Sequence, residues 1–272
     1  MRVLVTGATG QTGREVARLL GERDVPFRAA SRGTGFDWTD SGTFESALDG
    51  VDAAYLLPPP GGRNRMALLE PFLGAAKAAG VRRLVLLSTS VDEVPGQDEF
   101  HQAVIDAAPE YAILRPSWFM QNFLGPHPTA RDIAERGEVV SATGEGRLGF
   151  VHAEDIAAVA VETLLATEAP NRDYVITGPE ALSYRDVAKL IDEVAGYPVR
   201  YVPLTPEQGE ARWASFGLPP EAARFAVDLD RKLAAGLEDR VTATVRELTG
   251  RGARSFHEFV AAQRNHWQEM AK

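Results

Sequence analysis

The chain contains no cysteine among its 272 residues. This absence excludes disulfides, thiolate metal sites and a cysteine nucleophile. Four of the five histidines also show no metal-ligand spacing, so we expect no metal ion. Thiol and metal chemistry are therefore not expected.

Long apolar runs and an excess of basic residues are missing as well. No stretch approaches the length of a membrane span, and no basic and apolar leader opens the chain, so we expect a cytoplasmic protein without a membrane partner. The formal net charge is −9, and no basic face is visible in the sequence. Because binding to nucleic-acid phosphates needs such a face, we do not expect nucleic acid as a partner.

Glycine, in contrast, is concentrated near the start of the chain. Residues 3–6 form a short apolar strand, followed by three regularly spaced glycines and an amphipathic helix over 14–20; the glycines are Gly7, Gly10 and Gly13. Glycines let the backbone turn tightly and let a pyrophosphate approach without meeting a Cβ atom. The helix then directs its free N–H groups and the positive end of its dipole toward the anion. Strand, glycines and helix together predict a dinucleotide site.

The end of the next strand indicates which dinucleotide is bound. An enzyme that prefers NAD usually carries Asp or Glu about 20 residues beyond the glycines, where it accepts a hydrogen bond from the ribose 2′-hydroxyl. The stretch 26–32 contains no acid and ends in Ser31 and Arg32. Because a guanidinium pairs well with a 2′-phosphate, we expect NADP(H) rather than NAD(H). The alternative is that Arg32 is one of many solvated arginines.

Strand and helix patterns alternate through the first two-thirds of the chain. This alternation predicts an α/β fold, a Rossmann-type doubly wound parallel sheet with right-handed crossovers. A run of prolines and glycines over 58–62 stops the strand that precedes it. We expect strands over 26–32, 53–57, 83–88, 111–114 and 173–176, and helices over 66–79, 98–108 and 155–165.

The last third of the chain reads instead as helices joined by proline-containing links. Ser183 and Ser255 each stand three residues before an acid, as in a capping box at the start of a helix. Since ligands of doubly wound sheets bind beyond the carboxyl ends of the strands, we expect this region to cover that crevice. The predicted domains are a nucleotide-binding domain over 1–178, of which 116–150 contributes to the substrate pocket, and a small, mostly helical cap over 179–272.

Eight segments spread along the chain carry a resemblance to a known family. They are 6–13, 36–40, 56–59, 84–88, 114–123, 150–157, 177–183 and 254–259. Together they resemble an atypical short-chain dehydrogenase/reductase of the NmrA-like group, and within it the ergot-alkaloid reductases of the festuclavine- and agroclavine-dehydrogenase kind. The glycine loop is shared by the whole superfamily, whereas the Arg-Pro-x-Trp-Phe-Met-x-Asn-Phe pattern over 115–123 is much narrower.

The resemblance implies a role for individual residues along bound NADP(H). The pyrophosphate would lie on Thr6, Gly7, Thr9, Gly10, Gln11, Thr12 and Gly13. The 2′-phosphate would lie on Ser31 and Arg32, the adenine along Asp37 and Trp38 after a third strand, and the adenine ribose by Leu57 and Pro58. The nicotinamide ribose would lie near Ser88 and Thr89, and the nicotinamide would face Pro116 and Ser117.

The same resemblance implies that the residues after Pro116 line a substrate pocket. An aromatic cluster is more often part of a core, but this one directly follows a predicted strand at its carboxyl end, which favours a pocket. The residues concerned are Ser117, Trp118, Phe119, Gln121 and Asn122.

The chain lacks the acid that most short-chain dehydrogenases use. In that superfamily a tyrosine four residues before a lysine protonates the substrate oxygen, and none of the six tyrosines here has that lysine. His101 falls where many atypical members carry a lysine, and a histidine there can act as a general acid near neutral pH. The alternative is a solvated or capping histidine. Asp155, at the start of a helix, is expected to be structural.

The missing acid points to an acceptor that needs none. An iminium ion already carries the charge that accepts a hydride, and a quinone leaves a stabilised anion, so both need mainly proximity, alignment and a dry pocket. We therefore expect an NADPH-dependent reductase of a bulky, electron-poor small molecule, imine- or quinone-like, acting as a monomer or homodimer. The alternative is a non-catalytic NADP(H)-binding redox sensor. Nucleotide-sugar epimerisation ranks lower because it normally relies on the absent tyrosine.

Overall fold

A computed structural model describes residues 1–59, 65–92 and 94–270 of the chain. The chain forms two compact units, each discontinuous in sequence. Unit 1 comprises Met1–Pro116, Ala153–Ile176 and Ala243–Arg251, and unit 2 comprises Ser117–His152, Thr177–Thr242 and Gly252–Lys272. Of the stop predicted over 58–62, residues 60–62 lie outside the described part of the chain.

Unit 1 is built on a parallel sheet of six strands in the order β2-β1-β3-β4-β5-β8. Every residue of β1, β3 and β4 is buried, as expected for parallel strands covered on both faces. The predicted doubly wound α/β fold is thereby confirmed, with strand ends within two residues of those expected. The strands are β1 (Val3–Thr6), β2 (Phe27–Ala30), β3 (Ala53–Leu56), β4 (Arg83–Leu87), β5 (Glu110–Pro116) and β8 (Arg172–Ile176).

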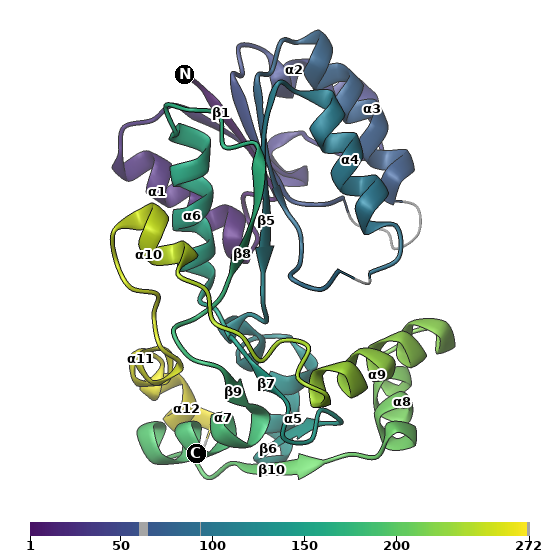
Figure 1. Ribbon diagram of the computed structural model, residues 1–272, viewed down its shortest axis with the longest axis vertical. Helices are drawn as coiled ribbons and strands as arrows, with labels where there is room; N and C mark the ends of the chain where they lie inside the picture. Colours follow the sequence, from purple (N-terminus) through teal and green to yellow (C-terminus); the bar gives the residue numbers. More distant parts are fainter. Residues whose placement is uncertain (60–64, 93, 271–272) are drawn as a thin grey trace. The chain divides into compact units, whose positions relative to one another are not determined.

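Helices cover both faces of this sheet (Figure 1). One face carries α1 (Gln11–Glu22), α6 (Ala153–Leu165) and α10 (Thr244–Thr249), and the other carries α2 (Phe44–Leu48), α3 (Arg65–Ala78) and α4 (Gln97–Ala107). Because β2 lies on one side of β1 and β3 on the other, the strand order reverses between β1 and β3. Doubly wound sheets bind ligands beyond the carboxyl ends of their strands at such a switch point.

The placement of residues 37 and 38 after a third strand is wrong. A 3₁₀ turn, η1 (Arg32–Thr34), follows β2 there, and the third strand, β3, begins only at Ala53. The turn forms because the Thr34 hydroxyl accepts the Ser31 N–H at 2.9 Å. Trp38 packs its ring edge against the core instead of entering a ladder, with 5.0 Å between its centroid and that of Phe72. A second 3₁₀ turn, η2 (Ser41–Thr43), leads into α2.

Unit 2 is mainly helical around a core of its own. Both capping boxes predicted from the sequence are present, with Ser183 accepting the Asp186 N–H and Ser255 accepting the Glu258 N–H. Its helices are η4 (Met120–Phe123), α5 (Pro128–Arg136), α7 (Tyr184–Leu190), the π-helical turn η5 (Ile191–Ala195), α8 (Pro206–Ser215), α9 (Pro220–Ala234), α11 (Phe256–Ala262) and α12 (Arg264–Met270). Its strands pair in twos, β6 (Glu138–Ser141) with β10 (Arg200–Pro203) and β7 (Arg147–Leu148) with β9 (Leu182–Ser183).

The division into units differs from the single boundary that the sequence suggested after residue 178. The chain enters unit 2 at Ser117, and the segment that carries α10 returns to unit 1 near its end. Thr244 holds this return by donating its hydroxyl proton to the Val175 carbonyl at 2.7 Å. Arg251 donates to Asp155 at 2.5 Å, and Asp155 is completely buried, in agreement with its expected structural role.

Candidate functional site

The loop between β1 and α1 needs glycine at two positions. Gly7 has a φ of +61°, and a Cβ atom on it would lie 2.4 Å from Leu57 Cδ2. A Cβ atom on Gly13 would lie 2.2 Å from the Gly7 carbonyl oxygen, so α1 packs on the loop only without one. Gly10 closes the turn by donating its N–H to that same oxygen at 2.8 Å. These contacts are the close backbone approach that a dinucleotide loop requires.

The N-terminus of α1 is open to an anion. Its N-cap, Gly10, provides no side-chain cap, and no acid stands in the first turn. Thr9 and Gln11 are exposed beside it, whereas Thr12 is buried beneath. Uncapped N–H groups and the positive end of the helix dipole fit a pyrophosphate, so the residues present suit a dinucleotide.

A buried hydrogen-bond chain fixes the loop from behind. The Thr6 hydroxyl donates to the Tyr55 carbonyl at 3.1 Å and accepts the Leu57 N–H at 2.7 Å. The Tyr55 hydroxyl donates to Thr12 Oγ1 at 2.8 Å, and burial raises the pKa of this phenol, so it stays protonated. Sequence reasoning missed Tyr55; its signal is one hydroxyl-bearing residue in an otherwise aliphatic strand.

Three of the residues expected around the adenine half lie close together after β2: Ser31, Arg32 and Asp37. Arg32 is exposed at the start of η1, next to Ser31. The Asp37 carboxylate accepts the N–H and hydroxyl of Thr39, both at 2.8 Å. These hydrogen bonds lower the pKa of Asp37, and the nearby Arg32 guanidinium lowers it further. Trp38 is only partly exposed, because its ring packs against the core of unit 1.

The carboxyl ends of β4 and β5 hold a second polar cluster. Ser88, directly after β4, places its Oγ 2.6 Å from Nε2 of His101 on α4. Burial, and then the Arg115 guanidinium, lower the pKa of His101, so its imidazole is neutral at neutral pH. The Thr89 carbonyl accepts from Arg115 Nε at 3.3 Å, and Pro116 ends β5 beside this cluster. Sequence reasoning missed Arg115.

Several cofactor residues expected from the sequence therefore lie at one edge of unit 1, one at the end of each of five strands. They stand at or just beyond the carboxyl ends of β1, β2, β3, β4 and β5, at Thr6, Ser31, Leu57, Ser88 and Pro116 respectively. Their individual contacts with NADP(H) stay predictions.

The residues expected to line the substrate pocket belong to unit 2. Phe119 forms an isolated parallel bridge with Val151, whose N–H donates to the Trp118 carbonyl at 2.8 Å. The Ser117 hydroxyl is buried and has no hydrogen-bond partner among the described residues. Gln121 and Asn122 lie in η4. The pocket itself stays a prediction.

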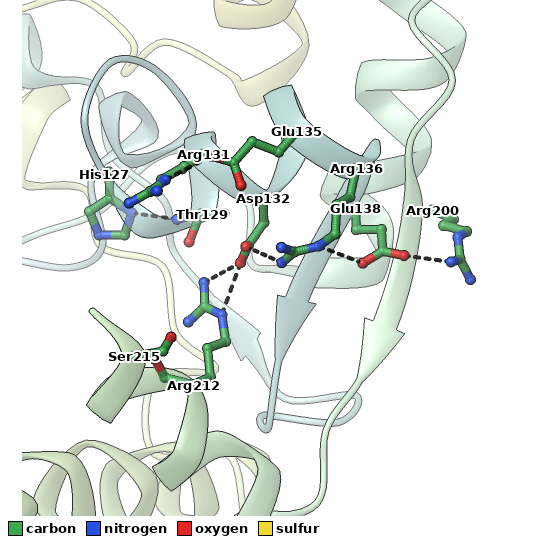
Figure 2. A network of polar contacts seen from close by, with 10 residues as sticks. All are labelled: His127, Thr129, Arg131, Asp132, Glu135, Arg136, Glu138, Arg200, Arg212 and Ser215. Atoms are coloured by element: carbon green, nitrogen blue, oxygen red, sulfur yellow. Dashed lines mark hydrogen bonds and ion pairs between the residues drawn. The ribbon is translucent and has the colours of Figure 1, made fainter. Parts of the chain in front are cut away.

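An ion-pair network that sequence reasoning missed crosses unit 2 (Figure 2). Asp132 on α5 is almost fully buried and accepts two hydrogen bonds from Arg212 on α8, at 2.9 and 2.6 Å. Arg136, one turn along α5, bonds its other oxygen and also reaches Glu138 at 3.2 Å. Glu138 in turn pairs with Arg200 at 2.5 Å. This network joins α5, α8, β6 and β10.

Two partly buried groups in unit 2 also have shifted pKa values. Burial and the Arg212 charge lower the pKa of His127 to about 4, while His127 Nδ1 accepts the Thr129 N–H at 3.2 Å. Burial raises the pKa of Asp230 to about 6, against a hydrogen bond from the Ala142 backbone and the charge of Arg212. Near neutral pH, His127 is therefore uncharged and Asp230 is close to its titration point.

Neither a metal centre nor a membrane-spanning helix is found among the described residues. No group of three or more His, Cys, Asp or Glu side chains in that part of the chain is arranged to hold a metal ion. No helix there has the length and apolar character needed to cross a bilayer.

Comparison with known proteins gives consistent matches over the chain. The model of the NmrA-like family matches residues 1–212. Agroclavine dehydrogenase of Claviceps fusiformis is 35% identical over 291 residues, covering 98% of this chain and 99% of that protein. An NAD(P)H azoreductase of Xenophilus azovorans is 34% identical over 284 residues, covering 96% and 97%.

A solved structure shows the same fold. The NADPH-dependent quinone oxidoreductase QOR2 of Escherichia coli, crystallised with NADPH, superposes with a TM-score of 0.78 at 24% identity, covering 96% of this chain and 99% of that one. The resemblance stated from the sequence motifs is thus confirmed, and the names of these proteins agree with the expected NADP(H)-dependent oxidoreductase.

Proposed function

The chain belongs to the NmrA-like family, and on that premise we propose that it is an NADPH-dependent reductase that transfers hydride to a bulky, electron-poor small molecule. The observation that carries the proposal is the β1–α1 loop. At Gly7 and Gly13 a Cβ atom would collide with Leu57 and with the loop backbone, while the uncapped start of α1 faces outward. Such a loop suits a pyrophosphate and little else of this size.

The preference for a phosphorylated cofactor depends on the end of β2. Arg32 is exposed there and free to turn its guanidinium to a 2′-phosphate, with the hydroxyl of Ser31 beside it. A bidentate guanidinium–phosphate pair supplies both charge and geometry. Asp37 is ionised close by, and its negative charge would disfavour a phosphate. The preference for NADPH over NADH therefore depends on Arg32.

The acceptor class follows from the acid that the chain lacks. None of the six tyrosines stands four residues before a lysine. Bound NADPH would supply the hydride, and this chain's residues would hold the acceptor against it and exclude water. Acceptors with an iminium or quinone group suit this arrangement because they are electron-poor enough to accept hydride without a strong acid. The names of the relatives, agroclavine dehydrogenase and azoreductase, are compatible with such acceptors.

A panel of acceptors tests the proposal. Purified protein is mixed with NADPH and, in separate reactions, with quinones, cyclic iminium ions, enones and simple ketones, and NADPH oxidation is followed at 340 nm. We expect turnover with the quinones or iminium ions at least about tenfold faster than with the ketones, because hydride transfer to a ketone needs a stronger acid, of the tyrosine–lysine kind that the chain lacks. Faster ketone reduction would contradict the acceptor class.

Binding measured by calorimetry separates the reductase from the redox sensor. Tight NADPH binding without turnover on any acceptor would favour a non-catalytic NADP(H)-binding regulator. No heat of association with NADPH or NADP⁺ would reject both functions.

A further inference from the structure

The proposed reduction leaves one proton unassigned. A neutral quinone that accepts a hydride becomes an oxyanion and must take up a proton, whereas a cationic acceptor becomes a neutral product without one. Proton transfer of this kind needs groups within hydrogen-bond reach that can pass a solvent proton on to the oxyanion. The carboxyl end of β4 carries two groups able to hold that proton, the Ser88 hydroxyl and the His101 imidazole.

We propose that Ser88 and His101 hand this proton to the reduced acceptor as a pair, with Arg115 as the residue that positions them. The inference rests on the proposed reductase function. The two partners are already 2.6 Å apart, Ser88 Oγ to His101 Nε2. The Ser88 backbone is fixed at the strand end, because its N–H bonds to the Leu114 carbonyl at 2.7 Å.

The order of the sheet places this pair on the nicotinamide half of the cofactor site. The pyrophosphate loop follows β1, and Arg32, for the 2′-phosphate, follows β2 on one side of it. The other half of the dinucleotide must then extend across β3 toward β4. Ser88 stands after β4, two strand spacings from β1, which is roughly 10 Å. A hydroxyl at that point would lie near the nicotinamide end of the cofactor and not near its adenine end.

Proton delivery by the pair balances. The Ser88 hydroxyl gives its proton to the product oxyanion and takes the proton that His101 carries on Nε2. Nδ1 of His101 takes up a solvent proton at the same time, and exchange with water then restores the Nε2–H form. Each turnover consumes one solvent proton and leaves the pair unchanged, while the electrons arrive with the hydride. A neutral imidazole suffices, so the pair works above the pKa of His101.

Arg115 holds the cluster by four contacts from β5. Its guanidinium donates to the Thr89 and Ser90 carbonyls at 3.3 and 3.1 Å, and to Asp173 on β8 at 3.0 Å. It also pairs with Asp92 in the loop after β4. These contacts fix the backbone immediately after Ser88 and place one positive charge beside the imidazole.

The charges that face His101 come from every element around it. Arg115 lowers the pKa of His101, and three carboxylates raise it: Asp98 on the same helix, Asp92 in the loop after β4, and Asp173 on β8. Burial outweighs all of them and, together with Arg115, keeps the imidazole neutral at pH 7. Removing the guanidinium would leave Asp92 and Asp173 facing His101 without it, so its pKa would rise.

Turnover with two acceptors tests the pair. His101→Ala and Ser88→Ala are compared with the wild type on 1,4-naphthoquinone, which needs a proton, and on crystal violet, a cation that does not. We expect kcat for the quinone to fall by about 10²-fold or more, with any turnover of the dye changed by less than about threefold. Gln102→Ala, an exposed neighbour of His101 on α4, is the matched control. Quinone kcat within about twofold of wild type in both variants would overturn the pair.

NMR titration of the imidazole tests Arg115 without turnover. The His101 signals of the unliganded protein are assigned with His101→Gln and followed from pH 4 to 9. We expect Arg115→Gln to raise the His101 pKa and Arg115→Lys to restore it.

The outcomes separate the two proposals. An unchanged His101 pKa in Arg115→Gln, with circular dichroism showing a folded protein, would overturn the positioning role. Absence of turnover in the wild type would overturn the reductase and the proton delivery together. Quinone turnover that survives both alanine variants would overturn only the pair.

Discussion

At the scale of single residues, we expect the charge at the end of β2 to decide which cofactor is preferred. Arg32 is exposed, and Asp37 beside it is kept ionised by two hydrogen bonds from Thr39. A carboxylate at the end of this strand favours a ribose hydroxyl over a phosphate dianion, and a guanidinium favours the reverse. The stretch 26–32 ends in a guanidinium and contains no carboxylate, so we expect that removing Arg32 shifts the preference away from the phosphorylated cofactor.

Arg32→Ala should weaken NADPH far more than NADH. A hydrogen bond to a charged group contributes about 1.5–3 kcal/mol, so the Kd for NADPH should rise roughly 10- to 100-fold. The Kd for NADH should change by less than about twofold, because NADH has no 2′-phosphate. Fluorescence titration of both cofactors measures this. Lys77→Ala removes the same charge from the exposed side of α3, near the amino ends of the strands, and should affect neither. Equal weakening of both cofactors would remove Arg32 from the site.

At the scale of elements, local patterns were enough to find most strands and helices. The buried strands read as unbroken apolar runs, and Ser183 and Ser255 mark helix starts by residues only three positions away. What local patterns could not give is which distant groups meet. Tyr55 and Thr12 are 43 positions apart, and Arg212 and Asp132 are 80 apart. Such pairs depend on the packing of whole elements, and so the back of the cofactor loop and the α5–α8 connection were missed.

The pair between α5 and α8 should be costly to break from one side. Side-chain exposure is 2% for Asp132 and 11% for Arg212, so neither charge is well screened by water. Arg212→Met leaves a buried carboxylate with Arg136 alone, and we expect a loss of about 3 kcal/mol in the free energy of unfolding. The double variant with Asp132→Leu should lose less, because no charge is then left buried. Urea denaturation measures both.

A control and a contrary result accompany this prediction. Arg231 and Asp228 form an exposed pair, with 58% and 60% side-chain exposure, and Arg231→Met should leave the unfolding midpoint nearly unchanged. If Arg212→Met behaved like Arg231→Met, the network in Figure 2 would not stabilise unit 2.

At the scale of the whole molecule, each unit is built from three separate segments of the chain. Thr244 and Arg251 fasten the last segment of unit 1 to Val175 and Asp155, far earlier in sequence. A sequence read from one end to the other suggests one boundary, because composition changes once, after residue 178. The composition of the segment that carries α10 does not show that it returns to unit 1. The sequence pattern of a short helix that packs on another helix is the same in either unit.

Unit 2 contains two groups whose linkage to folding has opposite signs. His127 has a pKa of about 4 when folded and 6.5 in an unfolded chain, so between these values the unfolded state binds more protons and stability rises with pH. Asp230 has a pKa of about 6 when folded and 3.8 unfolded, so the folded state binds more protons and stability falls as pH rises. Burial causes both pKa shifts. Near pH 5 the two groups contribute almost equal and opposite slopes to the dependence of the free energy of unfolding on pH.

The cancellation predicts opposite pH profiles for two single variants. With His127→Gln, only the Asp230 contribution remains, and the free energy of unfolding should fall by about 1 kcal/mol per pH unit from pH 4.5 to 6 relative to wild type. With Asp230→Asn, only His127 remains, and it should rise by a similar amount. Urea denaturation at several pH values, followed by tryptophan fluorescence, measures the slopes. Because all other titrating groups are common to the three proteins, they drop out of the difference. Parallel profiles for the two variants would show that burial does not shift the pKa of either group.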